Sequence, residues 1–353
     1  MAQEYSAPGA DSNVNPLNTT GLCLLSLDGG GVRGLLTLHV LKVIMGELNH
    51  QRQLNGLGRV KPCDVFDMIG GTSTGGLIAI MLGRLEMDVD ECIAAYNKLS
   101  ADVFAKPRST LRTILSGRVK ARFDSAKLKK AVLEIISNSS LPTDAPFNDG
   151  HDRGFTAAKD LKGIEQLRSY NIGGKESLPC TIWEAALATS AASGFFDPVN
   201  IGARKFIDGA LGANNPVEQV EREAMNVWCD EKGELKPLVQ CFVSIGTGNL
   251  GKKPIDDRFD RFVLGTLIGI ATETEKTAES FGLRWRQHYD EKRLFRFNVA
   301  QGLQDVGLEE HEKRDVIETA TSQYLEEQAQ RSSRRDCVQN LQAKQSVSAV
   351  EFA

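Results

Sequence analysis

The chain has 353 residues, of which 41% are hydrophobic and 25% are charged. These values are ordinary for a globular protein with a sizeable buried core, and the length allows one large α/β domain or a domain with a small extension. The formal net charge of −4 argues against a nucleic-acid partner, which requires a clearly basic domain. It does not exclude membrane contact, for which a local basic patch is enough.

The cysteine spacing and the hydropathy of the chain indicate its cellular location. The seven cysteines are scattered and form no CxxC pair, so we expect reduced thiols rather than disulfides or a metal site. The first twenty residues are polar and lack the apolar segment of a secretory signal. The longest apolar stretch, Phe262 to Ala271, is about half as long as a membrane span. We therefore expect an intracellular, cytoplasmic protein with peripheral membrane contact.

Apolar runs and helical periodicities alternate along the chain. The predicted strands are 22–27, 65–69, 154–158 (weak), 204–207, 238–245 and 294–299. The predicted helices are 35–48, 77–82, 89–99, 124–136, 181–192, one after Asn214 or Asn215, 259–281 and 310–328. Asp88 and Glu91 form a predicted capping box. The alternation indicates an α/β fold, a three-layer αβα sandwich with a mainly parallel central sheet.

The domain boundaries follow from the same patterns. We expect a disordered lead-in over residues 1–20 and a catalytic core over 21–217. Residues 218–330 are expected to continue the same α/β domain, with strands and helices that pack on the core. The segment 331–353 is expected to be a weakly structured tail. Sites in such folds form at the carboxyl ends of strands, where three candidate motifs lie.

The first motif is Gly71-Thr72-Ser73-Thr74-Gly75, which matches G-x-S-x-G between a predicted strand and a predicted helix. Glycine is needed on both sides because the serine occupies a sharp turn where a neighbouring Cβ would clash. The helix N-terminus behind the turn favours negative charge. We predict that Ser73 is a nucleophile, with Gly71 and Gly75 shaping the turn. The alternative is a glycine-rich turn with a capping serine.

The second motif, residues 29–34, also satisfies the dinucleotide pattern G-x-G-x-x-G. The acidic residue that should follow about twenty positions later is missing, so we expect no nucleotide cofactor. Unshielded amides at a helix N-terminus can instead stabilise an oxyanion. The predicted oxyanion site comprises Gly29, Gly30, Gly31, Val32 and Arg33. The Arg33 side chain is expected to brace this loop, to meet a lipid phosphate, or to be an exposed first-turn residue.

The third motif is Asp208-Gly209-Ala210, at the end of a predicted strand. None of the five histidines lies at a strand end beside a glycine turn. A carboxylate can act as the base if burial raises its pKa and it bonds the serine hydroxyl. We predict a Ser73–Asp208 dyad. Taken alone, an Asp-Gly dipeptide is also typical of an ordinary turn.

Together, the segments LSLDGGGVRG, FDMIGGTSTGGLIAI, FIDGALGANNP and VSIGTG resemble the patatin-like phospholipase family over residues 22–250. The resemblance implies a three-layer fold related to α/β hydrolases, with Ser73 as nucleophile, Asp208 as base and oxyanion donors around Gly30 and Gly31. Members hydrolyse acyl esters of phospholipids and neutral lipids without calcium, and some transfer acyl groups. The implied partner is a lipid at a membrane or micelle interface, and no cofactor is implied.

One position departs from the family pattern. Many members carry Pro-Thr after a Ser-Ala-Ala run, whereas this chain has Ser193-Gly194, which we expect to alter loop rigidity or the acyl pocket. The region 88–138 and the stretch WEAALATSAASGFFDP resemble the patatin domains of fungal multidomain receptors. No G-x-x-x-x-G-K-[ST] sequence is present.

Residues 102–130 contain nine Lys or Arg and two Asp or Glu. Such a segment either attracts anionic headgroups, at roughly 1 kcal/mol per well-placed charge, or forms an ordinary solvated basic face. Its basic residues include Lys106, Arg108, Arg112, Arg118, Lys120 and Arg122. The leading hypothesis is a lipid acyl hydrolase. The alternatives are a catalytically silent lipid-binding module, an acyltransferase and a nucleotide-binding protein; the sequence leaves the oligomeric state open.

Overall fold

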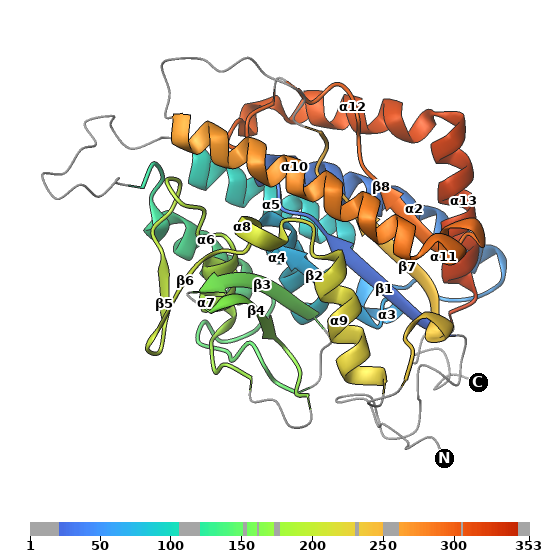
Figure 1. Cartoon of the computed structure of the whole chain (residues 1–353), viewed down its shortest axis with the longest axis horizontal. Coiled ribbons are helices and arrows are strands. Elements are labelled where there is room, and N and C mark those ends of the chain that lie inside the picture. Colours follow the sequence, from blue (N-terminus) through green and yellow to red (C-terminus); the bar gives the residue numbers. More distant parts are fainter. Residues whose placement is uncertain are drawn as a thin grey trace, which may run out of the picture.

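The computed structural model describes residues 21–105, 121–150, 154–160, 162–172, 177–229, 233–249, 261–304 and 306–344. Over this part of the chain, an eight-stranded sheet lies between two layers of helices (Figure 1). The α/β class and the three-layer arrangement predicted from the alternation of elements are confirmed.

The central sheet is mostly parallel, with antiparallel additions at one side. Its order is β5-β6-β3-β2-β1-β7-β8, and β4 pairs with β3 off this path. Strands β3, β2, β1, β7 and β8 are parallel neighbours, whereas β4, β5 and β6 pair in antiparallel fashion. The strands are β1 (Leu22–Leu27), β2 (Met68–Thr72), β3 (Gly154–Asp160), β4 (Gly163–Arg168), β5 (Val199–Ile201), β6 (Arg204–Asp208), β7 (Val239–Ile245) and β8 (Leu294–Phe297).

Helices cover both faces of this sheet (Figure 1). The first α-helices are α2 (Gly34–Leu54), α3 (Pro62–Val65), α4 (Thr74–Ala79), α5 (Val89–Phe104), α6 (Ser125–Asn138) and α7 (Ile182–Thr189). They are followed by α8 (Ala210–Ala213), α9 (Val217–Trp228), α10 (Arg261–Arg284), α11 (Arg286–Asp290), α12 (Arg314–Glu326) and α13 (Gln328–Gln342). The predicted capping box at the start of α5 is present, because the backbone amides of Asp88 and Glu91 each donate 2.8 Å hydrogen bonds to the other's carboxylate.

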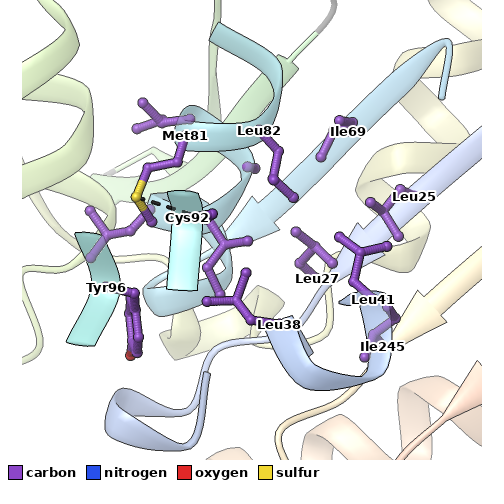
Figure 2. Packing of buried hydrophobic residues seen from close by; sticks show 14 of the residues in the cluster. Leu25, Leu27, Leu38, Leu41, Ile69, Met81, Leu82, Cys92, Tyr96 and Ile245 are labelled. Atoms are coloured by element: carbon purple, nitrogen blue, oxygen red, sulfur yellow. Dashed lines mark hydrogen bonds between the residues drawn. The ribbon is translucent and has the colours of Figure 1, made fainter. Parts of the chain in front are cut away.

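Alternating side chains of the strands divide the core into two hydrophobic clusters. In β1, Cys23, Leu25 and Leu27 face one cluster, whereas Leu22 and Leu24 face the other. Figure 2 shows the first cluster, where leucines of β1 pack against α2 and the segment after α4. The second cluster lies under α9 to α11. A strand that is buried on both faces has apolar residues at consecutive positions, so β1 and β7 could be predicted from the sequence.

Several predicted boundaries are wrong. The strand predicted at 65–69 is β2 at Met68–Thr72, because Pro62 begins a helical turn capped through Asp64 and the strand starts only after it. The strand predicted weakly at 154–158 is longer and lies inside the sheet. Strands β4 and β5 were not predicted; their residues are mostly half-buried and lack clear alternation. The helix predicted at 77–82 begins at Thr74 and continues as a π-helix over Ile80–Arg84.

The prediction of a weakly structured tail is wrong for residues 331–344. Helix α13 packs against α2 and β7 and buries Cys337, Val338 and Leu341. Beyond it, the Lys344 ammonium is 2.7 Å from the Asp67 carboxylate, and both side chains are buried. The apolar residues of α13 are few, but they share one face of the helix, and this face packs against α2 and β7. The predicted lead-in and residues 345–353 lie outside the described residues.

No helix in the described ranges has the length and apolarity required to cross a membrane.

Candidate active site

The strand register brings the first and third motifs to one level of the sheet. Thr72 of β2 pairs with Ala157 of β3, and the next residue, Ala158, pairs with Asp208 of β6. Because β6 is antiparallel to β3, it enters from beyond the carboxyl edge of the parallel strands and ends at that edge. Ser73, which follows β2 directly, therefore lies level with Asp208. The Ser73 Oγ donates a 2.7 Å hydrogen bond to Asp208 Oδ2.

Ser73 occupies a strained turn between β2 and α4. Its φ of 55° and ψ of −123° lie in a region that residues with a Cβ rarely adopt. A Cβ added at Gly71 would lie 2.0 Å from the Gly75 carbonyl oxygen, and one at Gly75 would lie 2.2 Å from the Leu27 carbonyl oxygen. These contacts explain both glycines of the motif physically. The Ser73 amide donates to Thr189 Oγ1 at 2.9 Å, which anchors the turn to α7.

Asp208 is 2% exposed and has two hydrogen-bond donors. Besides Ser73, the Ala210 amide donates to Oδ1 at 2.8 Å. Gly209 allows this close turn, since a Cβ there would lie 2.5 Å from the Ala157 carbonyl oxygen. Burial raises the pKa of the Asp208 carboxyl from 3.8 to about 7, although the bonds from Ala210 and Ser73 oppose this shift.

The carbonyl groups of the glycine loop are held by the surrounding protein. Gly29 O accepts hydrogen bonds from Thr247 Oγ1 at 2.8 Å and from Asn214 Nδ2 at 3.3 Å. Gly31 O accepts from Tyr96 Oη at 2.6 Å and from Thr74 Oγ1 at 3.0 Å. This fixes the orientation of the peptide planes. Gly31 has a φ of +58°, which favours glycine. A Cβ added to this residue would also lie only 2.2 Å from the Leu308 carbonyl oxygen.

Only part of the predicted oxyanion site has amides available to a ligand. The amide of Gly29 donates to Asn214 O at 3.0 Å, that of Val32 to Leu308 O at 2.8 Å and that of Arg33 to Gly30 O at 3.3 Å. The loop uses these three amides to hold its own shape, so the donors of the predicted site are expected at Gly30 and Gly31. The amides of Gly30 and Gly31 have no acceptor among the described residues.

The amide of Thr74 is a candidate donor that the sequence analysis missed. Thr74 is the first residue of α4, where helix geometry leaves the N–H without an intrahelical acceptor. The amide of the residue after the nucleophile commonly completes such a site. The G-x-S-x-G match itself could have indicated this residue.

The Arg33 side chain is buried rather than exposed. It is 3% exposed, and its Nη1 donates a long 3.4 Å hydrogen bond to Gly248 O. No carboxylate in the described part of the chain pairs with it, and its Nε has no partner there. Burial lowers the pKa of this guanidinium to about 10, so it keeps its charge at neutral pH.

Ser73, Asp208, the glycine loop and Arg33 all line one cavity of about 210 Å³. No histidine in the described ranges lines it. His39 lies on α2 near Glu318, and His288 bonds to Lys236 O; His151 lies outside the described residues. No group of three or more His, Cys, Asp or Glu is placed to hold a metal ion within the described ranges.

Supporting side chains come from segments far apart along the chain. Thr189 Oγ1, which accepts from Ser73, donates to Ala157 O at 2.7 Å. Asn214 Nδ2 also bonds Thr274 Oγ1 of α10 at 2.9 Å, which links the loop to that helix. Arg296 of β8 forms a two-point ion pair with buried Asp28, at 3.0 Å and 2.6 Å. Asn214, Thr247, Asp28 and Thr189 lie within segments that the sequence analysis quoted, but no role was predicted for them; Thr274 and Arg296 lie outside those segments.

The basic segment singled out in the sequence is described only in part. Its residues Lys106, Arg108, Arg112, Arg118 and Lys120 lie outside the described residues. Arg122 is described, and its guanidinium forms an ion pair with Glu309.

The chain is similar in sequence to proteins of one family. The family model described as patatin-like phospholipase matches residues 25–220. Calcium-independent phospholipase A2-gamma of Homo sapiens is 29% identical over 342 residues, covering 90% of this chain and 40% of that protein. The Mus musculus protein of the same name is 30% identical with the same coverage. Phospholipase A I of Arabidopsis thaliana is 27% identical over 294 residues, covering 65% of this chain and 21% of that protein.

The chain thus spans about 40% of the length of the mammalian relatives it matches. The family match nevertheless covers more than half of the chain and includes all three motifs. The chain belongs to the patatin-like phospholipase family.

Proposed function

We propose that the chain is a serine-dependent acyl hydrolase that cleaves fatty-acyl esters of phospholipids and glycerolipids without calcium. The observation that carries the proposal is the 2.7 Å hydrogen bond from Ser73 Oγ to Asp208 Oδ2 at the wall of a cavity that the glycine loop also lines. The names of the relatives support phospholipids as substrates and independence from calcium.

The proposed reaction begins with proton transfer. The Asp208 carboxylate accepts the hydroxyl proton as Ser73 Oγ attacks the ester carbonyl carbon. A base with a pKa of about 7 suits this task, because it is substantially ionised at neutral pH yet still basic enough to take a proton. Asp208 then returns the proton to the departing alcohol. Water cleaves the acyl-enzyme with Asp208 again acting as base.

The negative charge of the tetrahedral intermediate needs donors that are already in place. The amides of Gly30, Gly31 and Thr74 are the proposed donors, since surrounding contacts hold the loop and the start of α4. Each donor of this kind typically contributes roughly 3–4 kcal/mol to transition-state stabilisation. Thr74 Oγ1 bonds Gly31 O, so the nucleophile turn and the glycine loop are held to each other.

Arg33 supports a phosphate-bearing substrate. The buried guanidinium of Arg33 has no carboxylate partner among the described residues, so a bound anion would stabilise its positive charge. It lines the same cavity as Ser73. We propose that it faces the phosphate of a phospholipid whose ester carbonyl is at Ser73.

A silent lipid-binding module is the competing function. Two features favour catalysis over mere binding: the strained backbone of Ser73 and the raised pKa of Asp208. Both cost stability, and a binding protein needs neither.

Labelling with a fluorophosphonate probe tests the proposal. The wild-type protein should be labelled at one serine and should hydrolyse phospholipid vesicles. The Ser73→Ala variant should show neither labelling nor hydrolysis. Ser125→Ala is a matched control, because Ser125 Oγ also donates to an aspartate, Asp197, at 3.0 Å, but on the surface. It should keep both activities. A folded Ser73→Ala protein with full hydrolysis would sink the proposal.

A further inference from the structure

The cavity beside Ser73 has apolar lining residues that the proposed chemistry does not use. Leu77 of α4, Leu99 of α5 and Leu128 of α6 line the cavity. Three phenylalanines bound it: Phe104 at the end of α5, and Phe195 and Phe196 in the loop after α7. A fourth, Phe123, lies behind them and is 1% exposed. These four phenylalanines are called the aromatic wall below.

The aromatic wall is a connected cluster. The Phe123 ring centroid lies 5.0 Å from that of Phe104 and 6.0 Å from those of Phe195 and Phe196. The Phe104 and Phe196 centroids are 6.1 Å apart. Such ring pairs stabilise a fold by more than the burial of their apolar surface alone. Phe195 and Phe196 are each 8% exposed and line the cavity, so a ligand there touches rings that are already packed.

Backbone contacts hold the aromatic wall in place. The amide of Arg122 donates to Gly194 O at 3.0 Å, and the amide of Phe123 donates to Phe195 O at 2.9 Å. Gly194 has a φ of +85°, a conformation that glycine adopts without strain. This is the position where the sequence departs from the family's Pro-Thr. The local turn therefore delivers Phe195 and Phe196 to the cavity.

Other segments that line the cavity contribute polar side chains. Thr247 follows β7, Asn298 follows β8, and Thr274 lies on α10; all three line the cavity. In the sheet order, β7 and β8 lie on one side of β2, whereas β3 and β6, against which α7 packs, lie on the other. Ser73, at the end of β2, lies between these two groups of strands. An ester carbonyl held at Ser73 thus has a polar side and an apolar side available.

We propose that the aromatic wall receives the distal end of the substrate's acyl chain and sets the length of fatty acid that the protein accepts. The inference rests on the proposed function only in placing the ester carbonyl at Ser73. The cavity volume of about 210 Å³ is small for a whole lipid, since sites for entire small molecules are about 300–1,000 Å³. One chain fits this size, and the wall bounds its depth.

Two substitutions with opposite expected effects test the proposal. Phe196→Ala removes one ring of the wall and lengthens the cavity, whereas Phe196→Trp enlarges that side chain and shortens the cavity. The readout is the ratio of kcat/KM for p-nitrophenyl palmitate to that for p-nitrophenyl butyrate in the full chain. The ratio should rise by about tenfold or more in Phe196→Ala and fall in Phe196→Trp, because each methylene gained or lost in an apolar pocket changes discrimination by about that factor.

Phe281→Leu is the matched control. Phe281 belongs to another buried aromatic cluster, with Phe242 and Trp285, and does not line the cavity. Its palmitate-to-butyrate ratio should equal that of the wild type. Thermal melting of each variant shows whether the fold is retained. If Phe196→Ala unfolds, Phe196→Leu and Phe196→Trp still give a smaller rise and a fall in the ratio.

A binding assay separates this inference from the proposed function. In the Ser73→Ala background, straight-chain fatty acids from octanoate to stearate compete with a fluorescent fatty acid. Phe196→Ala should shift the tightest binder to longer acids and Phe196→Trp to shorter ones, whether or not Ser73 is the nucleophile. A length preference that is the same in both folded variants and in the Phe281→Leu control would overturn the role of the wall.

Discussion

Asp208 is the residue on which the pH dependence should turn. Its carboxyl must be ionised to accept the Ser73 proton, and burial raises its pKa to about 7. With a soluble short-chain ester, kcat/KM should therefore increase with pH and reach half its maximum near pH 7. An unperturbed aspartate would already be fully active at about pH 5. A profile that is flat from about pH 5 to 8 would show that the pKa of the reacting base is not raised to about 7.

The same shift in pKa has a consequence for stability. Between about pH 4 and pH 7, folded Asp208 holds a proton that the unfolded chain has released. The free energy of unfolding contributed by this group therefore decreases as pH rises through that window and is constant above it. At neutral pH, ionisation of the buried Asp208 carboxyl therefore lowers the free energy of unfolding.

Asp208→Asn should separate activity from stability. The amide oxygen can still accept from the Ala210 amide, but the side chain cannot take a proton. We expect kcat to fall by about 10²–10⁴-fold, the usual contribution of a general base. Urea unfolding should show the variant gaining stability relative to wild type as pH rises from about 4 to 7. A variant that loses stability relative to wild type over this window would show that burial does not raise the pKa of Asp208.

At the scale of elements, apolar strands and glycine turns were predictable, whereas weakly patterned elements were not. The run Leu22–Leu27 is buried on both faces, so its composition alone predicts a strand. The half-buried β4 and the polar α13 depend on tertiary contacts for their stability. No local pattern predicts that β6 runs antiparallel to β3, although this pairing sets the level of Asp208.

The candidate site divides in the same way. Ser73, Asp208 and the glycine loop were found because short-range chemistry demands glycine beside each of them. Thr189 anchors the Ser73 amide from 116 positions away, and although it lies in a quoted segment, nothing in the local sequence indicated this contact. The choice of oxyanion donors also depended on the fold, since the amides of Gly29 and Val32 donate to Asn214 and Leu308. Motifs identify the reacting groups, and long-range contacts decide which atoms remain available.

Helix α13 should contribute substantially to stability despite its polar sequence. Leu341 is 1% exposed and belongs to the core cluster that α2 and β7 share. Leu341→Ala should lower the free energy of unfolding by about 2–5 kcal/mol, as large-to-small substitutions in a packed core do. Gln339→Ala, at an exposed position of the same helix, should change it by less than about 0.5 kcal/mol. Equal urea midpoints for the two variants would mean that the helix does not dock.

At the scale of the whole molecule, the cavity offers different surroundings to different parts of the proposed lipid substrate. The ends of β7 and β8 offer polar groups, the aromatic wall offers an apolar stop, and Ser73 lies between them. Arg33 adds a buried cation to the same cavity. In the proposed reaction one chain of the lipid enters this cavity and the remainder stays outside, so we expect the protein to meet its substrate at an interface. The net charge of −4 opposes attraction to an anionic surface, so contact needs a local basic region.

Residues 102–130, with nine basic and two acidic side chains, are the strongest candidate for that region. Reversing Lys106, Arg108 and Arg112 to glutamate should weaken binding to phosphatidylserine vesicles by at least about a hundredfold, since each basic charge contributes roughly 1 kcal/mol at an anionic surface and each new acidic charge is repelled. Salt should weaken wild-type binding in the same direction. Reversing three exposed arginines elsewhere, Arg222, Arg286 and Arg335, makes the same change in net charge and should weaken binding far less. If both triple variants bind equally, net charge rather than this segment governs membrane contact.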